Sequence, residues 1–170
     1  MARALIVGCG CRGRELGERL LAEGWAVRGT SRREEGLGAI EAAGIESALA
    51  DPDRPGTILE LVGDVAVLVL LFGGVSGSDE EVAAIHGPRL ERLMEHLVET
   101  PVRGVVYEGT EAGSEVVRAA GRTWRIPVRT IAASLSQSLY STEGDRLAAE
   151  VAAALAGESK ELNSDGNSGN

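Results

Sequence analysis

A glycine-rich turn near the amino terminus constrains the fold of this chain more than any other feature. Residues 4–7 read Ala-Leu-Ile-Val and lead into Gly8-Cys9-Gly10-Cys11-Arg12-Gly13, a G-x-G-x-x-G pattern that precedes a helical stretch. After a strand, Gly8 permits a tight turn, Gly10 permits close approach of a pyrophosphate, and Gly13 permits close packing of the helix on the sheet. The N–H groups of Cys11, Arg12 and Gly13 would then point at the phosphates, helped by the helix dipole. This context favours a dinucleotide-binding turn over a glycine turn without a ligand.

The end of the second apolar run indicates which dinucleotide to expect. An NAD site usually has Asp or Glu about twenty residues after the glycines, where the carboxylate accepts hydrogen bonds from the ribose. Here the chain reads Val27-Arg28-Gly29-Thr30-Ser31-Arg32-Arg33, without an acid. The hydroxyls of Thr30 and Ser31 can donate to a 2′-phosphate, and the guanidinium of Arg32 or Arg33 can clamp it. We therefore expect NADP(H), with NAD(H) less favoured. The alternative is that both arginines are solvated at the start of the next helix.

Strand and helix patterns alternate along the chain. The expected helices lie at about 11–24, 34–43, 55–62, 79–99 with a break at Gly87-Pro88, 114–124, and from Ser141 or Thr142 to 157. The expected strands lie at 3–8, 25–30, 45–50, 65–72, 102–107 and 128–132. One β-run per crossover predicts an α/β fold, a doubly wound parallel sheet of about six strands in the order 3-2-1-4-5-6, that is, a Rossmann fold.

Composition supports one domain at residues 1–157. The chain has 170 residues, of which 44% are hydrophobic, and its net charge of −9 disfavours binding to nucleic acid or an anionic membrane. The longest apolar run, residues 65–72, is too short to span a bilayer, and the amino-terminal residues do not resemble a signal peptide. We expect a cytoplasmic protein. Residues 158–170 are polar and are expected to form a disordered tail.

The loops at the carboxyl ends of the strands hold the remaining candidate contacts. Asp51 follows the third strand, where its carboxylate fits two roles: accepting a hydrogen bond from the adenine amino group, or capping the next helix. Phe72 and Gly73 follow the fourth strand and fit either contact with the adenosine or a flexible loop. The segments 107–111 and 134–140 would face a nicotinamide or a substrate.

The glycine turn, the Thr30-Ser31-Arg32 run, Asp51 and the Val105-Val106-Tyr107 run together resemble the atypical and extended short-chain dehydrogenase/reductase superfamily of epimerase- and dehydratase-like proteins. The resemblance covers about residues 3–132. It implies that the glycines bind the pyrophosphate, that Arg32 binds the 2′-phosphate and that Asp51 contacts adenine. Extended members usually have G-x-x-G-x-x-G, and Val7 at the first of these positions favours the atypical branch.

The resemblance does not extend to the catalytic residues of the superfamily. Reductases of the superfamily use a Tyr-x-x-x-Lys pair, but Tyr107 is followed four residues later by Glu111 and Tyr140 by Gly144. Lys160 is the only lysine of the chain, so no lysine is available in the body of the domain to lower a tyrosine pKa. The carboxyl-terminal substrate domain of extended members is also absent from this sequence. Thr110, near the superfamily's catalytic Ser/Thr position, is expected to be a helix cap or a loop residue.

Other reactive side chains predict no further site. His86 and His96 are expected at the surface, without a third metal ligand, and Cys9 and Cys11 are expected to be buried packing thiols, with a redox switch as the alternative. Glu108 and Glu111 fit either an acid–base pair or ordinary partners of a helix dipole. No metal site is expected.

Three functions remain open. The chain is expected to be an NADP(H)-binding module, either a plain cofactor-binding unit or a redox-sensing one, without short-chain dehydrogenase catalysis. The alternatives are an NADP-dependent oxidoreductase or epimerase-like enzyme of unknown substrate, and a degenerate Rossmann domain kept as an interaction surface. The apolar stripe of the last helix, Leu147, Val151, Ala154 and Leu155, fits packing on its own sheet or on a second copy in a homodimer.

Overall fold

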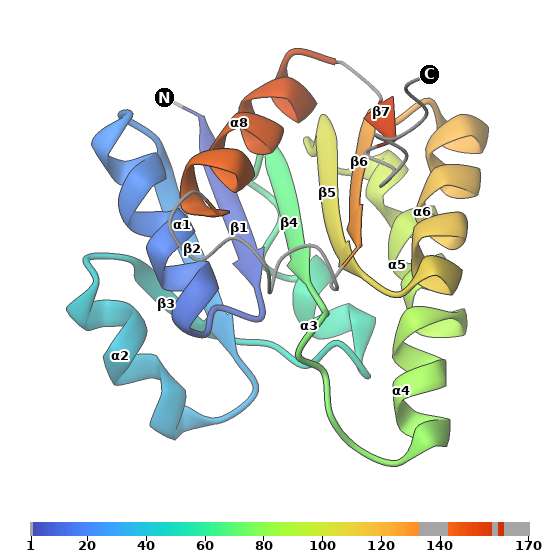
Figure 1. The fold of residues 1–170 in the computed structure, drawn as a ribbon, viewed down its shortest axis with the longest axis horizontal. Helices are drawn as coiled ribbons and strands as arrows, with labels where there is room; N and C mark the ends of the chain where they lie inside the picture. The colour runs from blue at the N-terminus through green and yellow to red at the C-terminus, as the bar shows by residue number, and fades with distance from the viewer. Residues whose placement is uncertain (1, 133–142, 158–159, 162–170) are drawn as a thin grey trace, which may run out of the picture.

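Parallel strands form the centre of the protein, and helices cover both faces of the sheet (Figure 1). The computed structural model describes residues 2–132, 143–157 and 160–161. The strands, in chain order, are β1 Arg3–Val7, β2 Ala26–Ser31, β3 Glu46–Leu49, β4 Val67–Leu71, β5 Gly104–Gly109, β6 Val128–Ala132 and β7 Lys160–Glu161. They pair in the order β3-β2-β1-β4-β5-β6-β7, all parallel. The predicted α/β class and the order 3-2-1-4-5-6 are confirmed, and β7 extends the sheet by a two-residue strand inside the segment that the sequence predicts to be disordered.

Helices connect successive strands, as the crossovers of a parallel sheet require. Their bounds are α1 Cys11–Ala22, η1 Glu34–Gly36, α2 Leu37–Ala42, α3 Pro55–Leu59, α4 Asp79–His86, α5 Pro88–His96, η2 Leu97–Glu99, α6 Glu111–Trp124 and α8 Glu143–Leu155. Within the part of the chain that the structure describes, none of them is long and apolar enough to cross a membrane.

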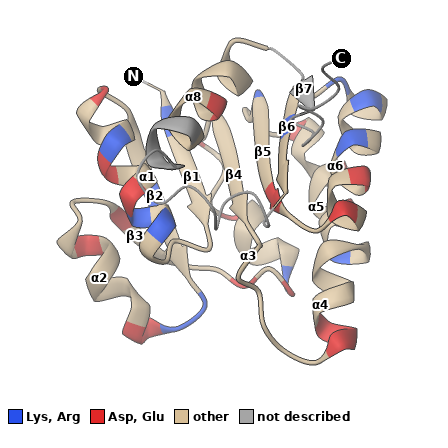
Figure 2. Ribbon diagram, viewed as in Figure 1, with Lys and Arg blue, Asp and Glu red and all other residues tan. Residues whose placement is uncertain are grey.

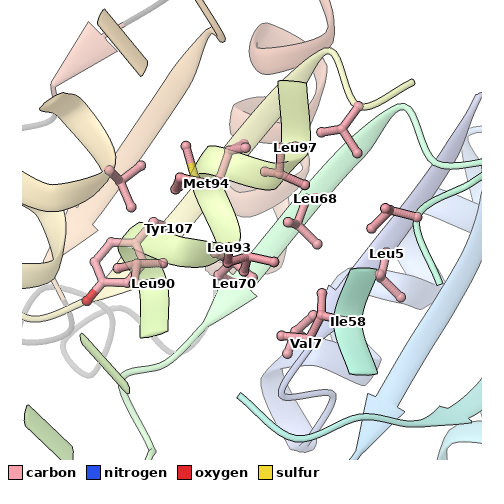
Figure 3. Close-up of a cluster of buried hydrophobic side chains, with 14 of the residues drawn as sticks. Leu5, Val7, Ile58, Leu68, Leu70, Leu90, Leu93, Met94, Leu97 and Tyr107 are labelled. Carbon is pink, nitrogen blue, oxygen red and sulfur yellow. The ribbon is translucent and has the colours of Figure 1, made fainter. Parts of the chain in front are cut away.

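Alternation along β4 divides the core into two layers. Leu68 and Leu70 face one side of the sheet with Leu5, and there they pack against α3, α5 and α6 (Figure 3). Val67 and Val69 face the opposite side and pack against α1 and α8. Every residue of β4 is buried, as expected for a central strand covered on both faces.

Local sequence signals after β4 determine where α4 begins and where it is separated from α5. The Ser78 hydroxyl accepts the Glu81 N–H, and the Glu81 carboxylate accepts the Ser78 N–H, which makes the predicted capping box at the start of α4. Gly87 and Pro88 separate α4 from α5, as predicted, because proline has no N–H to continue the helical hydrogen bonds.

Three segments differ from the sequence-based expectation. The helix predicted at 34–43 is a 3-10 turn over 34–36 followed directly by α2 over 37–42, and the stretch ends before Gly44, which has φ +79°. The strand predicted at 102–107 runs instead to Gly109, because Glu108 and Gly109 continue the pairing with β4 and β6. Helix α6 starts at Glu111 rather than near 114, with Thr110 as its cap.

The apolar stripe of helix α8 is buried inside the molecule. Leu147, Val151 and Ala154 are each at most 2% exposed, and α8 packs on α1 and on the strands β4 to β6. A buried ion pair between Arg129 of β6 and Glu150 fastens the helix to the sheet. The stripe therefore packs on its own sheet, while a homodimer through another surface stays a prediction. The proposed cap of α8, Ser141 or Thr142, lies outside the described residues, as does Tyr140.

Candidate functional site

The glycine turn between β1 and α1 has the geometry that its sequence predicts. Gly8 has φ +83°, and a Cβ there would lie 2.6 Å from the carbonyl oxygen of Leu71 in β4. At Gly13 a Cβ would lie 3.2 Å from Gly8 O and from the Ile6 side chain. Gly8 therefore permits the left-handed turn, and Gly13 permits the close seat of α1 on the sheet.

Gly10 faces open space instead of protein. A Cβ at Gly10 would have no heavy atom within 4 Å, and Gly10 is the N-cap of α1 without a side-chain cap. The helical hydrogen bonds begin with Arg14 N–H, which donates to Gly10 O at 2.9 Å. The N–H groups of Cys11, Arg12 and Gly13 therefore lie at the open end of the helix, and the first turn of α1 has no acidic residue to interact with them.

A pocket of about 750 Å³ opens at this turn. It brings together the glycine turn, the loop after β2, the start of the loop after β3 and the end of β4. Its lining residues are Gly8, Cys9, Gly10, Cys11, Arg12, Gly13, Arg14, Thr30, Ser31, Arg32, Arg33, Glu35, Gly36, Ala39, Ala50, Pro52, Leu71, Phe72, Gly74, Val75 and Ser76. The described lining includes ten of the twelve residues predicted as cofactor contacts. The two that are not in it are Asp51, which lies between the lining residues Ala50 and Pro52 in the chain, and Gly73, which is exposed.

The charge of the pocket is opposite to that of the chain. Four arginines line it, and Glu35 is the single acid among the described lining residues, although the whole chain carries a net charge of −9. Figure 2 shows these basic positions at the start of α1 and in the loop after β2. The arrangement suits an anionic ligand.

The residues at the end of β2 have two different environments: Thr30 is buried, whereas the turn that follows it is exposed. Thr30 is 1% exposed, and its carbonyl accepts the Cys9 N–H at 3.0 Å, which ties β2 to the glycine turn. The Ser31 hydroxyl donates to Arg33 O at 2.8 Å and accepts the Arg33 N–H at 3.1 Å. This closed turn leaves the side chains of Arg32 and Arg33 exposed at the pocket.

Arg32 and Asp51 meet, although nineteen positions separate them in the sequence. Arg32 Nε lies 3.2 Å from Asp51 Oδ1, and the two side chains are 47% and 32% exposed. Asp51 Oδ1 also accepts the Asp53 N–H at 3.0 Å, so the carboxylate stabilises the turn before α3, whose N-cap is Arg54. An exposed ion pair of this kind contributes about 0–1 kcal/mol, so a stronger anion can displace it.

Arg12 makes a contact that the sequence does not predict. Its guanidinium forms a bidentate ion pair with Glu108, with Nη1–Oε2 at 2.6 Å and Nη2–Oε1 at 2.5 Å. Glu108 is fully buried in β5, and the Arg12 side chain is 31% exposed. The expectation that Glu108 lies in a loop was wrong, because its charge is paired and the strand continues through it. An acid directly after the apolar Val105-Val106-Tyr107 run, with an arginine in the glycine turn, was the available signal.

Tyr107 and His86 form a buried polar pair, and neither residue is part of the pocket lining. His86 Nδ1 lies 2.7 Å from the Tyr107 hydroxyl, which also accepts the Thr110 N–H at 3.0 Å. Phe72 packs edge-on against both rings. Burial lowers the pKa of His86 below its ordinary value, and burial together with the neighbouring Glu108 charge raises the pKa of Tyr107 against the opposing hydrogen bond from Thr110.

The expectation of a surface His86 was therefore wrong. Its hydrogen bond and ring contacts satisfy the imidazole in the core, and its position four residues after Val82 on α4 was the sequence signal. His96 is exposed, as expected. Thr110 is a helix cap, as expected, since its side chain accepts the Gly113 N–H at 3.0 Å.

The two cysteines have different environments. Cys9 is buried, and burial raises the pKa of its thiol to about 11. Cys11 is exposed at the pocket, with Arg14 Nη2 at 3.4 Å from its sulfur, so the expectation of a second buried thiol was wrong. No group of three or more metal-ligating side chains occurs among the residues that the structure describes.

Solved structures with very different sequences have the same architecture. A UDP-N-acetylglucosamine 4-epimerase from Bacillus cereus matches with a TM-score of 0.70 over 96% of this chain and 75% of its own, at 12% identity. A short-chain dehydrogenase/reductase superfamily protein from Agrobacterium tumefaciens with bound NAD matches with a TM-score of 0.61 over 75% of this chain and 48% of its own, at 17% identity. This chain has a Rossmann fold. Triphenylmethane reductase from Citrobacter sp., solved in complex with NADP(H), shares that fold with a TM-score of 0.60 over 76% of this chain and 48% of its own, at 18% identity.

These matches confirm the resemblance in fold that the sequence predicts. This Rossmann chain spans about half the length of the superfamily protein and of the reductase, and three quarters of the epimerase. No family model matches the chain, and no curated protein matches its sequence significantly.

Proposed function

We propose that this chain binds NADP(H) in the pocket at the carboxyl ends of β1, β2 and β4, as a cofactor-binding module. The observation that carries the proposal is that Arg32 and Arg33, with no acid at the end of β2, line the same pocket as the glycine turn. The diphosphate would lie on the amino end of α1, beside Gly10, where a side chain would otherwise fill the space. The solved neighbours that carry NAD or NADP(H) support a nicotinamide dinucleotide as the class of ligand.

The 2′-phosphate would lie against Arg32 and Arg33. A carboxylate at this position would repel a 2′-phosphate, whereas two guanidinium groups attract it. The Arg32–Asp51 pair is an exposed contact through one nitrogen, so a dianionic phosphate competes well for Arg32. Asp51 then remains free to accept a hydrogen bond from adenine while its other contact holds the turn before α3.

The module would work without the tyrosine chemistry of the short-chain dehydrogenases. Tyr107 is fully buried, its hydroxyl contacts His86 and Thr110, and its raised pKa opposes formation of a phenolate. Tyr107 is also not among the residues that line the pocket. No lysine lies within residues 1–159 to lower that pKa.

Titration calorimetry with NADP⁺ and NAD⁺ tests the proposal. A charge-assisted contact contributes about 1.5–3 kcal/mol, so NADP⁺ should bind about tenfold to a hundredfold more tightly than NAD⁺. In the double variant Arg32→Ala, Arg33→Ala the two affinities should differ by less than about threefold. The matched control is Arg92→Ala, Arg122→Ala, which removes the same charge at exposed positions outside the pocket and should keep the preference. Equal affinities in the unaltered protein would refute the assignment of NADP(H).

A further inference from the structure

The described lining of the pocket stops at β4. It draws on the turns after β1, β2 and β3 and on the end of β4 with its loop, and among the described residues none from β5, α6 or β6 contributes. In the sheet β5 lies next to β4, on the side away from β1. The described lining therefore covers the half of the sheet edge that would hold the adenosine and the diphosphate.

The ion pair between Arg12 and Glu108 lies at the β5 end of this lining. Glu108 stands beside Leu71 in the parallel register, and Leu71 is part of the pocket lining. Arg12 lies at the amino end of α1 and lines the pocket, and its guanidinium donates two hydrogen bonds to the carboxylate of Glu108. The pair thus joins the phosphate-binding turn directly to β5, next to the last strand of the pocket.

The pair resists opening. Glu108 has no exposed surface, so separating it from Arg12 would leave a buried carboxylate without its bidentate partner, which is strongly unfavourable. Beyond the pair, β5 passes into α6 through Thr110 alone. The N–H of Thr110 donates to the Tyr107 hydroxyl and its side chain caps α6, so the connection offers no long loop to receive a nicotinamide ring.

We infer that the Arg12–Glu108 pair closes the pocket on the β5 side, so that the site binds the 2′-phospho-ADP-ribose part of NADP(H) and leaves the nicotinamide outside. The inference rests on the proposed function and narrows it. The ligand class is an adenosine 2′-phosphate carrying a 5′-diphosphate, and the affinity does not depend on the redox state of the nicotinamide.

Titration calorimetry of the whole chain with three ligands tests this inference. NADP⁺, NADPH and 2′-phospho-ADP-ribose should have dissociation constants within about threefold of one another, because they share every group that the pocket contacts. Nicotinamide mononucleotide at millimolar concentration should not bind. The fluorescence emission of NADPH should keep the wavelength and intensity of the free cofactor.

The outcomes separate the two proposals. If NADP⁺ or NADPH binds more than tenfold more tightly than 2′-phospho-ADP-ribose, or if NADPH emission changes on binding, the nicotinamide is held and the inference is wrong, while NADP(H) binding stands. If none of the three ligands binds, the proposed function fails and the inference fails with it. A tighter binding of one redox form alone would instead assign a redox-sensing role.

A variant that removes the pair tests its role as the boundary. In Arg12→Ala, Glu108→Ala both charges leave together, which avoids an unpaired buried carboxylate. NADPH should then bind at least about threefold more tightly relative to 2′-phospho-ADP-ribose than in the unaltered protein. The matched control is Arg89→Ala, Asp53→Ala, which removes an exposed ion pair outside the pocket and should leave the ratio near one. A ratio near one in a folded Arg12, Glu108 variant would show that another group bounds the site.

Discussion

The same substitution at Gly8 and at Gly10 should have opposite consequences for folding and for binding. At Gly8, alanine must adopt φ +83°, which costs about 1–2 kcal/mol for a residue with a Cβ. Its Cβ would also lie 2.6 Å from the Leu71 carbonyl oxygen, a backbone atom that cannot rotate away, and overpacking of this kind costs about 1–3 kcal/mol. Gly8→Ala should therefore lower the free energy of unfolding by about 2–5 kcal/mol.

At Gly10 the same methyl group meets no protein atom. The φ of −79° is accessible to alanine, and no heavy atom lies within 4 Å of the added Cβ. Alanine is a poorer N-cap than glycine, but it also reduces the entropy of the unfolded chain, and the two effects nearly cancel. Gly10→Ala should change the free energy of unfolding by less than about 1 kcal/mol. It should weaken NADP(H) binding at least about tenfold, because the methyl group fills the space beside the diphosphate.

Urea denaturation and titration calorimetry on the two variants measure both effects. For a chain of this size, the Gly8→Ala cost corresponds to a fall of about 1–2 M in the urea midpoint. Gly63→Ala is the matched control, since its added Cβ also meets nothing within 4 Å and it lies outside the pocket. Equal stability of Gly8→Ala and Gly10→Ala would refute the steric argument, and an unchanged NADP(H) affinity in Gly10→Ala would show that the ligand does not approach the turn.

Two further predictions concern the buried pair of His86 and Tyr107. Because burial lowers the pKa of His86, the unfolded chain binds a proton near pH 6.5 that the folded chain resists, so the free energy of unfolding should fall as pH drops below about 6.5, by up to about 1.4 kcal/mol per pH unit. Urea denaturation from pH 5 to 8 should show this slope in the unaltered protein and in His96→Gln but not in His86→Gln; an unchanged slope in His86→Gln would refute the assignment. An assay of NADPH oxidation with aldehydes, ketones and nucleotide sugars should give no turnover above background, and Tyr107→Phe should leave NADP(H) affinity within about twofold. Turnover that disappears in Tyr107→Phe would make the protein an enzyme of the short-chain dehydrogenase type.

Most of the fold could be predicted because its signals are local. The capping box of Ser78 and Glu81 and the break at Gly87-Pro88 depend on residues within a few positions of one another, and each formed as predicted. The fully apolar run that becomes β4 requires cover on both faces, which in turn requires crossover helices and a parallel sheet. The order 3-2-1-4-5-6 was predicted because it is the usual order for such a sheet with a glycine turn after its first strand.

In the candidate site, too, the features with local sequence signals could be predicted and the contacts between distant residues could not. Ten of the twelve predicted contact residues line the pocket, because they lie at the ends of strands whose carboxyl ends share one edge of the sheet, whereas Ala39 of α2 was not predicted. The residues with which those side chains form ion pairs could not be predicted. Arg32 pairs with Asp51, and Arg12 pairs with Glu108 from a position 96 residues away in the sequence. Sequence also misplaced His86, since a lone histidine gives no sign of the tyrosine that satisfies it.

The sequence by itself determined the alternation of strands and helices, the glycine turn and the basic character of the loop after β2, because backbone conformation and apolar periodicity depend on neighbouring residues. The tertiary structure alone decided which partners Glu108 and His86 have in the core. A carboxylate or an imidazole can be buried only where a partner compensates its lost hydration, and that partner arrives only when the sheet brings α1 to β5 and α4 to Tyr107. These side-chain pairings are therefore a property of the assembled sheet.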